Sequence, residues 1–454
     1  MLYVSTRGGA DAVTFMEAVS RGLAPDGGLY VPESFPDQAA LLRSPENMTY
    51  ARFAEAWLAP FASGMPEGAL ARCCDEAWRD FPEGEPAPVV RLSDDLAILE
   101  LFHGPTQAFK DFALRFLGRV QAVRAAGTGE TITVLGATSG DTGAAAVHAV
   151  PAEAGRCVIL YPAGRIAPLA ERQMLCDAPA HTLALALDGD FDTCQAIVKT
   201  LMADPAARSR HRLAAVNSIN IARILAQSVY YARACAKLGD EAFRRGIRVV
   251  VPSGNFGNAL AADYARRMGA PIREIVAATN ANDTLARFFS TGEYAPGVTL
   301  ATLAPAMDIS KPSNFERWLW HASAGDAKFV REVLGTTGSV RPELPAPDFM
   351  PSGFATPDAA IPGIIRDVYR RFGYVLDPHT ACAFGRPVPA DGAITLVAAT
   401  AHPAKFPETL VPALGFEPTH PALERLKSMP LERHVIPATP EAVLERLERF
   451  ESGR

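Results

Sequence analysis

The chain has 454 residues, which corresponds to about three domains of ordinary size. Lys plus Arg number 44 and Asp plus Glu number 50, and the resulting net charge of −6 argues against a nucleic-acid partner, because phosphate backbones bind to cationic surfaces. Hydrophobic residues make up 48% and charged residues 21%, which is ordinary globular usage and excludes a disordered chain.

Targeting and metal-binding signals are weak throughout the sequence. No uninterrupted apolar stretch reaches the roughly 18 residues of a membrane span, and the first residues lack the pattern of a secretory signal. The 7 cysteines form no C-x-x-C pair, and the 9 histidines form no H-x-H or H-E-x-x-H spacing. We therefore expect a cytoplasmic protein with reduced thiols, no metal site and no membrane partner.

The first 95 residues read as an N-terminal domain. A turn cluster at residues 25–28 precedes a short strand at 29–31, and apolar spacing predicts helices over 50–58 and 67–78. The proline-rich stretch 81–88 reads as a linker.

Strands and helices alternate after this linker. Strands are predicted at 96–102, 131–135, 158–161, 247–251, 275–278 and 394–397. Helices are predicted over a long pattern that opens at 106–112 with Thr106 as N-cap, over 144–149, and over 259–268. This alternation predicts a mostly parallel sheet covered by helices on both faces.

Two glycine-rich loops follow apolar strands and open helices, where backbone N–H groups bind anions. The first consists of Gly254, Asn255, Phe256, Gly257 and Asn258, and fits a phosphate, although an ordinary strand-to-helix turn has the same composition. It matches neither the dinucleotide nor the nucleoside-triphosphate motif.

The second loop offers hydroxyls, a carboxylate and N–H groups to a small carboxylate ligand. It contains Thr138, Ser139, Asp141 and Thr142. Simple helix capping would favour the same residues.

Lys110 lies at the expected start of a helix, between Phe109 and Phe112. The positive helix end and apolar neighbours both favour the neutral amine, which a Schiff base with a carbonyl cofactor requires. A solvated surface lysine is the alternative. Near the C-terminus, the Thr400 hydroxyl could bond a ring nitrogen at the end of a strand, and Lys405 could bind an anion.

Together these stretches resemble the threonine synthase family, pyridoxal-phosphate enzymes that make L-threonine from O-phospho-L-homoserine. The matching segments span almost the whole chain and lie at 5–8, 22–32, 103–106, 108–112, 137–143, 217–220, 222–223, 253–258, 278–283, 305–309, 312–317 and 400–406. The N-terminal matches resemble the branch that has an added N-terminal domain.

The resemblance implies the tryptophan-synthase β-like fold (fold type II), with the cofactor in a cleft between two α/β domains. The domains would be an N-terminal domain 1–95, a smaller domain with the substrate loop at about 96–240, and a larger cofactor domain 241–454. Lys110 would bind the cofactor pyridoxal 5'-phosphate covalently, residues 254–258 would hold its phosphate, and Thr400 would face its pyridine nitrogen.

The substrate carboxylate would lie on the loop 138–142. Asp141 stands where relatives in the wider fold group often have an amide, so we assign it no contact with the cofactor's phenolic oxygen. Lys405, Lys311 and Arg317 are candidates for binding the leaving phosphate.

The implied reaction is a γ-elimination of phosphate followed by addition of water at Cβ, catalysed by Lys110. Two other enzyme functions remain open, a phospho-lyase on the same scaffold that releases a 2-oxo acid and ammonia, and a dehydratase acting on serine or threonine. A pyridoxal-phosphate-binding protein without turnover is a further alternative. The sequence leaves monomer and homodimer open.

Overall fold

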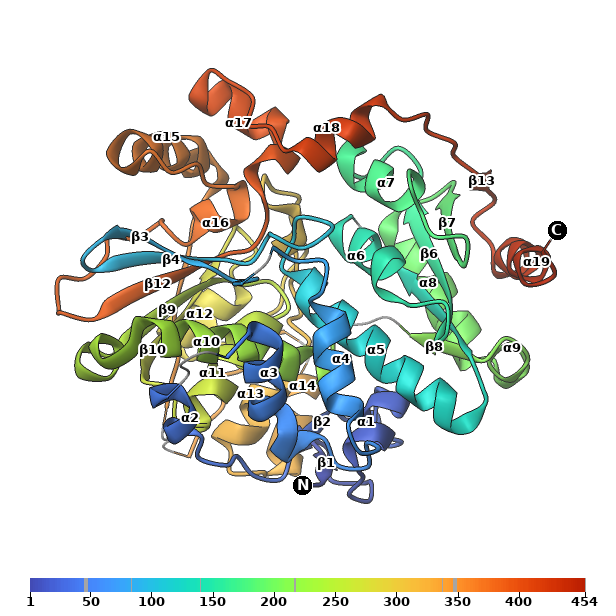
Figure 1. Ribbon diagram of the computed structural model, residues 1–454, viewed down its shortest axis with the longest axis horizontal. Helices are drawn as coiled ribbons and strands as arrows, with labels where there is room; N and C mark the ends of the chain where they lie inside the picture. The colour runs from blue at the N-terminus through green and yellow to red at the C-terminus, as the bar shows by residue number, and fades with distance from the viewer. Residues whose placement is uncertain are drawn as a thin grey trace. The chain divides into compact units, whose positions relative to one another are not determined.

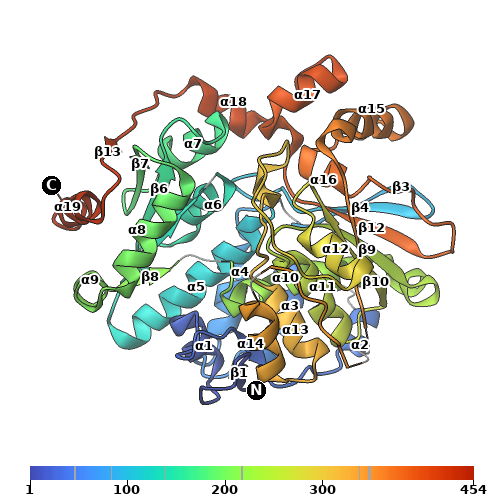
Figure 2. The ribbon, with the colours of Figure 1, turned by 180° about the vertical axis from the view of Figure 1, so that it is seen from behind.

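The computed structural model describes residues 1–44, 48–82, 84–138, 140–215, 218–336, 338–345 and 349–453. The chain divides into two compact units, and each unit is built from two separate segments of the sequence (Figures 1 and 2). The first unit comprises Met1–Phe109 and Ser218–Pro418, and the second comprises Lys110–Asn217 and Thr419–Arg454.

The first unit contains an N-terminal set of elements and a longer α/β set. The N-terminal elements are β1 (Tyr3–Ser5), α1 (Phe15–Arg21), β2 (Tyr30–Pro32), α2 (Ala39–Arg43), α3 (Tyr50–Leu58), α4 (Ala69–Ala77), β3 (Val89–Ser93) and β4 (Leu96–Glu100). The later elements are α10 (Ile221–Arg245), β9 (Ile247–Pro252), α11 (Gly257–Arg267), β10 (Ile272–Thr279), α12 (Thr284–Thr291), α13 (Phe315–Ala322), α14 (Ala327–Gly335), β11 (Ser352–Ala355), α15 (Ile361–Phe372), α16 (Pro378–Cys382), β12 (Ile394–Ala399) and α17 (Pro407–Leu414). Short 3₁₀ turns lie at Ala59–Phe61, Pro305–Met307, Asp358–Ala360 and Pro403–Lys405.

The main sheet of this unit has the strand order β11-β10-β9-β12-β4-β3. Its pairs are parallel, apart from β3, which runs antiparallel to β4. All residues of the central strands β9 and β12 are buried, as expected for strands covered on both faces. Helix α11 lies on one face of the sheet and α16 on the other (Figure 1).

The N-terminal elements pack on α10, which belongs to the same unit. The Trp57 indole N–H donates to Ser228 Oγ at 3.0 Å, and Asn220 Nδ2 donates to the Val19 carbonyl at 2.9 Å. Both contacts are buried, so their loss would leave polar groups unsatisfied. These contacts explain why the N-terminal residues do not form a compact unit of their own.

The second unit is a smaller α/β structure. Its elements are α5 (Lys110–Thr128), β5 (Ile132–Ala137), α6 (Asp141–Ala149), β6 (Gly155–Pro162), α7 (Pro168–Leu175), β7 (Thr182–Leu187), α8 (Phe191–Ala203), α9 (Pro205–Arg210), β8 (Leu213–Ala215), α18 (Pro421–Ser428), β13 (Val435–Ile436) and α19 (Pro440–Glu451). The sheet order is β13-β7-β6-β5-β8, and the pairs are parallel. The C-terminal residues thus complete a sheet that began 300 residues earlier.

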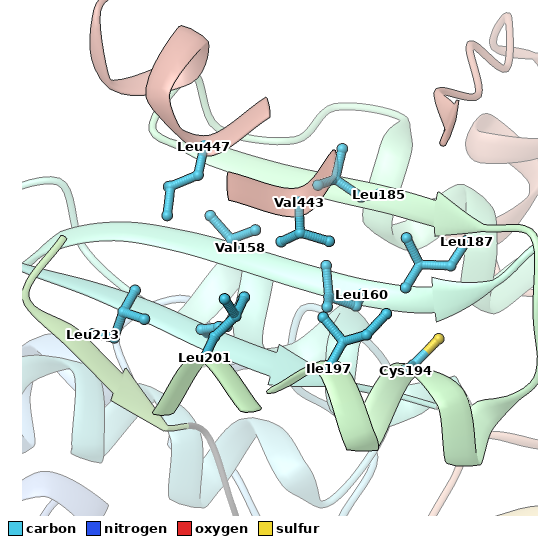
Figure 3. Close-up of a cluster of buried hydrophobic side chains, with 11 residues drawn as sticks. Val158, Leu160, Leu185, Leu187, Cys194, Ile197, Leu201, Leu213, Val443 and Leu447 are labelled. Carbon is cyan, nitrogen blue, oxygen red and sulfur yellow. The ribbon is translucent and has the colours of Figure 1, made fainter. Parts of the chain in front are cut away.

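An apolar cluster joins α8 and the C-terminal helix α19 to the sheet of this unit (Figure 3). Val443 and Leu447 of α19 are fully buried against strand residues such as Val158 and Leu185. Helix α6 lies on the opposite side of the sheet from α19 (Figures 1 and 2). The predicted arrangement, a mostly parallel sheet covered on both faces, is confirmed in each unit.

The unit boundaries at 109/110, 217/218 and 418/419 differ from the domain boundaries expected near 95 and 240. The chain leaves the first unit at the start of α5 and returns just before α10, and neither position shows a change in composition. The assignment of 1–95, 96–240 and 241–454 as three domains stays a prediction. No helix in the described ranges is both long and apolar enough to cross a membrane.

Candidate active site

The loop 253–258 connects β9 to α11, as the sequence predicts for a strand-to-helix anion site. A Cβ at Gly254 would lie 3.0 Å from Met307 Cα and 3.3 Å from the Ala306 carbonyl oxygen, so this position accepts glycine alone without a shift. Phe256 has a positive φ of 61° and its ring is buried against Phe289. Phe256 can therefore contribute its backbone to an anion, but not its side chain.

The asparagines of this loop have fixed orientations. Asn255 accepts from the backbone and side-chain amides of Asn314 through its carbonyl oxygen, at 3.1 and 3.2 Å. Asn258 Oδ1 accepts from the hydroxyls of Tyr230 and Tyr231 at 2.6 and 2.8 Å. In this arrangement the tyrosine hydroxyls are bonded to Asn258 Oδ1, and the donor Nδ2 lies at the other branch of the amide.

The donors of the loop fit a phosphate group. Asn258 Nδ2 and the neighbouring Ser253 Oγ are buried atoms without a hydrogen-bond partner in the described part of the chain. Buried donors normally have partners, and phosphate oxygens at the N-terminus of α11 would supply them. The 254–258 loop thus has the composition, position and donors that the phosphate of pyridoxal 5'-phosphate requires.

Thr400 lies directly after β12 and beside the segment that precedes Lys110. Its carbonyl oxygen accepts from the Phe109 N–H at 2.9 Å, and its N–H donates to Thr380 Oγ1 at 3.3 Å. The Thr380 hydroxyl in turn donates to the buried carboxylate of Asp377. The backbone of Thr400 is therefore held through both its N–H and its carbonyl, and the residue is 6% exposed.

Lys405 is buried in the same region. Its Nζ donates to the Thr106 carbonyl oxygen at 2.9 Å, and 4% of the residue is exposed. Its ammonium group therefore lies beside the 106–109 segment, which immediately precedes Lys110. The sequence identified this lysine, although no pattern predicted its contact with Thr106.

Lys110 is the first residue of α5, in the second unit. Its Nζ lies 3.7 Å from Asp141 Oδ2, and each side chain is 11% exposed. Asp141 is the first residue of α6, so the two helices begin next to each other. The expected catalytic lysine and the expected substrate loop are thus in contact, while a solvated surface lysine is excluded by this burial.

The Thr138 hydroxyl is occupied within its own loop. It accepts from the N–H groups of Gly140 and Gly143 at 3.0 and 2.9 Å and donates to the Gly140 carbonyl at 3.0 Å. These bonds fix the shape of the loop. The donors at the start of α6, including Thr142, are therefore better candidates than Thr138 for binding a carboxylate. Ser139 lies outside the described residues.

Arg317 is not a candidate for binding the leaving phosphate. Its side chain is fully buried, and burial lowers the pKa of its guanidinium to about 10. Its nitrogens donate to the Tyr30 carbonyl, Asn314 Oδ1 and the Ile219 carbonyl, at 2.9, 2.6 and 2.5 Å. Lys311 is exposed. Asn314 is a contact residue of the 254–258 loop that residue-level reasoning missed, because an asparagine before a helix is ordinarily a cap.

Three family models match the chain in sequence order. The threonine synthase N terminus model matches residues 2–78, the pyridoxal-phosphate dependent enzyme model matches 84–333, and the threonine synthase C-terminal model matches 381–447. The pyridoxal-phosphate enzyme model therefore covers more than half of the chain.

Relatives and solved structures agree with the family models. Threonine synthase from Pseudomonas aeruginosa is 39% identical over 93% of this chain and 92% of its own, and that from Saccharomyces cerevisiae is 38% identical over 91% and 89%. The structure of PLP-bound threonine synthase from Brucella melitensis is 38% identical, covers 99% of both chains and has a TM-score of 0.94. Yeast threonine synthase is 33% identical, covers 100% of this chain and 99% of its own, and has a TM-score of 0.91.

These matches confirm the expected fold class, a fold-type II pyridoxal-phosphate enzyme with an N-terminal domain, and its cofactor. The chain belongs to the threonine synthase family of pyridoxal-phosphate-dependent enzymes.

Proposed function

We propose that the protein converts O-phospho-L-homoserine and water into L-threonine and inorganic phosphate. The observation that carries this proposal is the 3.7 Å separation between Lys110 Nζ and Asp141 Oδ2. It places a buried amine beside the loop expected to bind the substrate carboxylate. A lysine that must move protons on an amino acid needs this proximity to the group that holds the amino acid.

The chain's own residues divide the work as follows. Lys110 would hold the cofactor covalently, and its amine would take the proton from the substrate's Cα and exchange protons at Cβ. Pyridoxal phosphate would supply the electron sink for the negative charge that develops on substrate carbon. The N-terminus of α6, with Asp141 and Thr142, orients the substrate. The backbone N–H groups there hold the substrate's carboxylate.

Residues of the first unit hold the cofactor in this proposal. The 254–258 loop binds its phosphate, and the Thr400 hydroxyl bonds the pyridine nitrogen. A neutral hydroxyl can do so without forcing that nitrogen to be protonated, as a carboxylate would. Lys405 contributes positive charge for an anionic group of the substrate. The partners are thus the small-molecule substrate and the cofactor, with no nucleic acid or membrane, and the seven buried cysteines support a cytoplasmic location.

The test is an incubation of purified holoprotein with O-phospho-L-homoserine, assayed for threonine, inorganic phosphate and 2-oxobutyrate. Equal amounts of threonine and phosphate support the proposal. Phosphate accompanied by 2-oxobutyrate and ammonia would replace it with a phospho-lyase. Binding of the cofactor without formation of either product would indicate a pyridoxal-phosphate-binding protein that does not catalyse this reaction.

Lys110→Ala should abolish both product formation and the visible absorbance of covalently bound cofactor. Lys328→Ala is the matched control, because that exposed lysine pairs with Glu332 on the surface of α14. The control should keep wild-type spectrum and activity. An unchanged spectrum in Lys110→Ala would refute the assignment of this lysine.

A further inference from the structure

A chain of polar contacts links the N-terminal residues to the 254–258 loop, entirely within the first unit. Thr6 is fully buried, and its hydroxyl donates to Glu316 Oε1 at 2.6 Å while it accepts from the Leu29 N–H at 2.8 Å. Arg7 donates to both carboxylate oxygens of Glu316, at 3.2 and 3.1 Å. The Thr6–Arg7 pair thus fixes the first turn of α13.

The next residue, Arg317, continues this chain. Its Nε donates to the Tyr30 carbonyl of β2, and its Nη1 donates to Asn314 Oδ1 at 2.6 Å. Asn314 and Arg317 are both fully buried. The guanidinium is always a donor, so it fixes which end of the Asn314 amide is oxygen. Rotation of that amide would place its NH₂ group against the guanidinium N–H groups.

This fixed amide points its donors at the phosphate loop. Asn314 donates through its backbone N–H and its Nδ2 to the Asn255 carbonyl, at 3.1 and 3.2 Å. Ser313 Oγ donates to Asn255 Oδ1 at 3.0 Å. Asn255 is therefore held at its backbone and its side chain by two consecutive residues. Its conformation depends on contacts that begin at Thr6.

We propose that the N-terminal segment sets the affinity of the protein for the phosphate of its cofactor, through Glu316, Arg317 and Asn314. Asn314 is a positioning residue, which acts on the phosphate through Asn255. The proposal rests on the assignment of the 254–258 loop to the cofactor phosphate. It gives Thr6 and Arg7 a role shared with residues 313–317 that the reaction itself does not require.

The test compares pyridoxal phosphate with pyridoxal, which lacks the phosphate. Both form the bond to Lys110, so the ratio of their dissociation constants isolates the loop. Full-length protein is stripped of cofactor, and each compound is titrated back while the visible absorbance is recorded. The variants are Thr6→Val, Asn314→Asp and the milder Ser313→Ala, which removes the hydrogen bonds of a half-buried hydroxyl to Asn255 and Ser218.

Thr6→Val and Asn314→Asp should each weaken pyridoxal phosphate about tenfold and pyridoxal less than twofold, because a lost hydrogen bond is a loss of this order. Ser313→Ala should shift the same ratio in the same direction. Thr14→Ala is the matched control, since Thr14 lies in the N-terminal elements but caps α1 through Glu17 and has no contact with Glu316 among the hydrogen bonds of the described residues. The control should lose stability without changing the ratio.

Equal weakening of both compounds would overturn the proposal, because it would show general destabilisation. An unchanged ratio in Ser313→Ala and Asn314→Asp would overturn it as well. Asn255→Ala tests the premise, and a wild-type ratio there would remove the loop from the phosphate site. Cofactor binding is measured without substrate, so these outcomes are independent of whether threonine is formed.

Discussion

Gly143→Ala probes the loop that we assign to the substrate. A Cβ at this position of α6 would lie 2.5 Å from Thr138 Cγ2 and 2.6 Å from Met174 Sδ. The Met174 thioether can turn away, because methionine is flexible. Thr138 cannot, since its hydroxyl is bonded to three backbone groups of the same loop.

The required movement can be estimated from these distances. Ordinary contacts of a Cβ begin at about 3.4 Å, so the loop or the helix start must shift by about 0.9 Å. A misplacement of about 1 Å at a catalytic centre costs roughly 10²-fold in rate. We therefore expect kcat/KM for O-phospho-L-homoserine to fall about 10²-fold, while the visible absorbance of the cofactor proposed to be bound to Lys110 is retained.

The assay is steady-state release of phosphate, with the visible absorbance recorded on the same samples. Gly127→Ala is the control in the same unit, because a Cβ there meets no atom within 4 Å and alanine favours helix. Wild-type kcat/KM in Gly143→Ala would refute the assignment of the 138–142 loop to substrate. Loss of the cofactor spectrum would show instead that the shift reaches Lys110.

Three further predictions concern stability. Leu447→Ala should lower the free energy of unfolding, measured in urea, by about 2–5 kcal/mol, because this side chain is fully buried in the cluster of Figure 3. Leu444 is only partly buried, so Leu444→Ala should lower it less. Equal effects would contradict the burial of Leu447 in this cluster. Arg433 donates to both oxygens of Glu171 and holds the pKa of that carboxyl below its usual value. This ion pair stabilises the fold above pH 4.5, and the stabilisation is lost as Glu171 is protonated on acidification. Arg433→Gln should therefore lower the free energy of unfolding by about 1 kcal/mol at pH 7, a small value because the arginine is partly exposed. In urea titrations below about pH 4, wild type and variant should have the same stability. Burial, with Arg267 nearby, lowers the pKa of His321 to about 3, so on acidification the unfolded chain takes up a proton before the folded chain does. The stability of the wild type should therefore fall by up to about 1.4 kcal/mol per pH unit below 6.5. His321→Gln should flatten this slope in thermal melts, and an unchanged slope would show that His321 is not the group responsible.

Local patterns were sufficient for much of the fold. The helix predicted over 50–58 coincides with α3, and the strand predicted over 247–251 with β9 apart from one residue. Both are signalled by apolar spacing within a few residues. The strands β1, β3, β7, β8, β11 and β13 were missed. The long helix α10 was also missed, although it is the helix on which the N-terminal elements pack. Its buried face includes Arg223, Gln227 and Arg233, and this polar content obscures its apolar pattern.

The helix predicted to follow Thr106 begins at Lys110 instead. The preceding residues pair with the far end of the chain, since Ala108 forms a bridge with Ala401 and Phe109 bonds Thr400. A tertiary contact therefore takes precedence over the local capping preference. No single-sequence pattern predicts such pairing across about 290 residues.

The candidate site shows the same division between local and long-range information. Lys110 and the 254–258 loop could be proposed as site residues because glycines, asparagines and a helix-start lysine carry their chemistry in consecutive residues, and their roles stay predictions. Arg317 was misjudged, because sequence shows a cation but not the three acceptors that surround it. Those acceptors come from segments near residues 30, 219 and 314, so the role of Arg317 depends on the folded chain. Each nitrogen of the buried Arg317 guanidinium donates a hydrogen bond, so this residue has a structural role. It fixes Asn314, which in turn holds Asn255. The role that we propose for Arg317 is therefore indirect, because Asn314 and Asn255 both stand between it and the phosphate of the cofactor, whereas the sequence made it a candidate for binding the leaving phosphate directly.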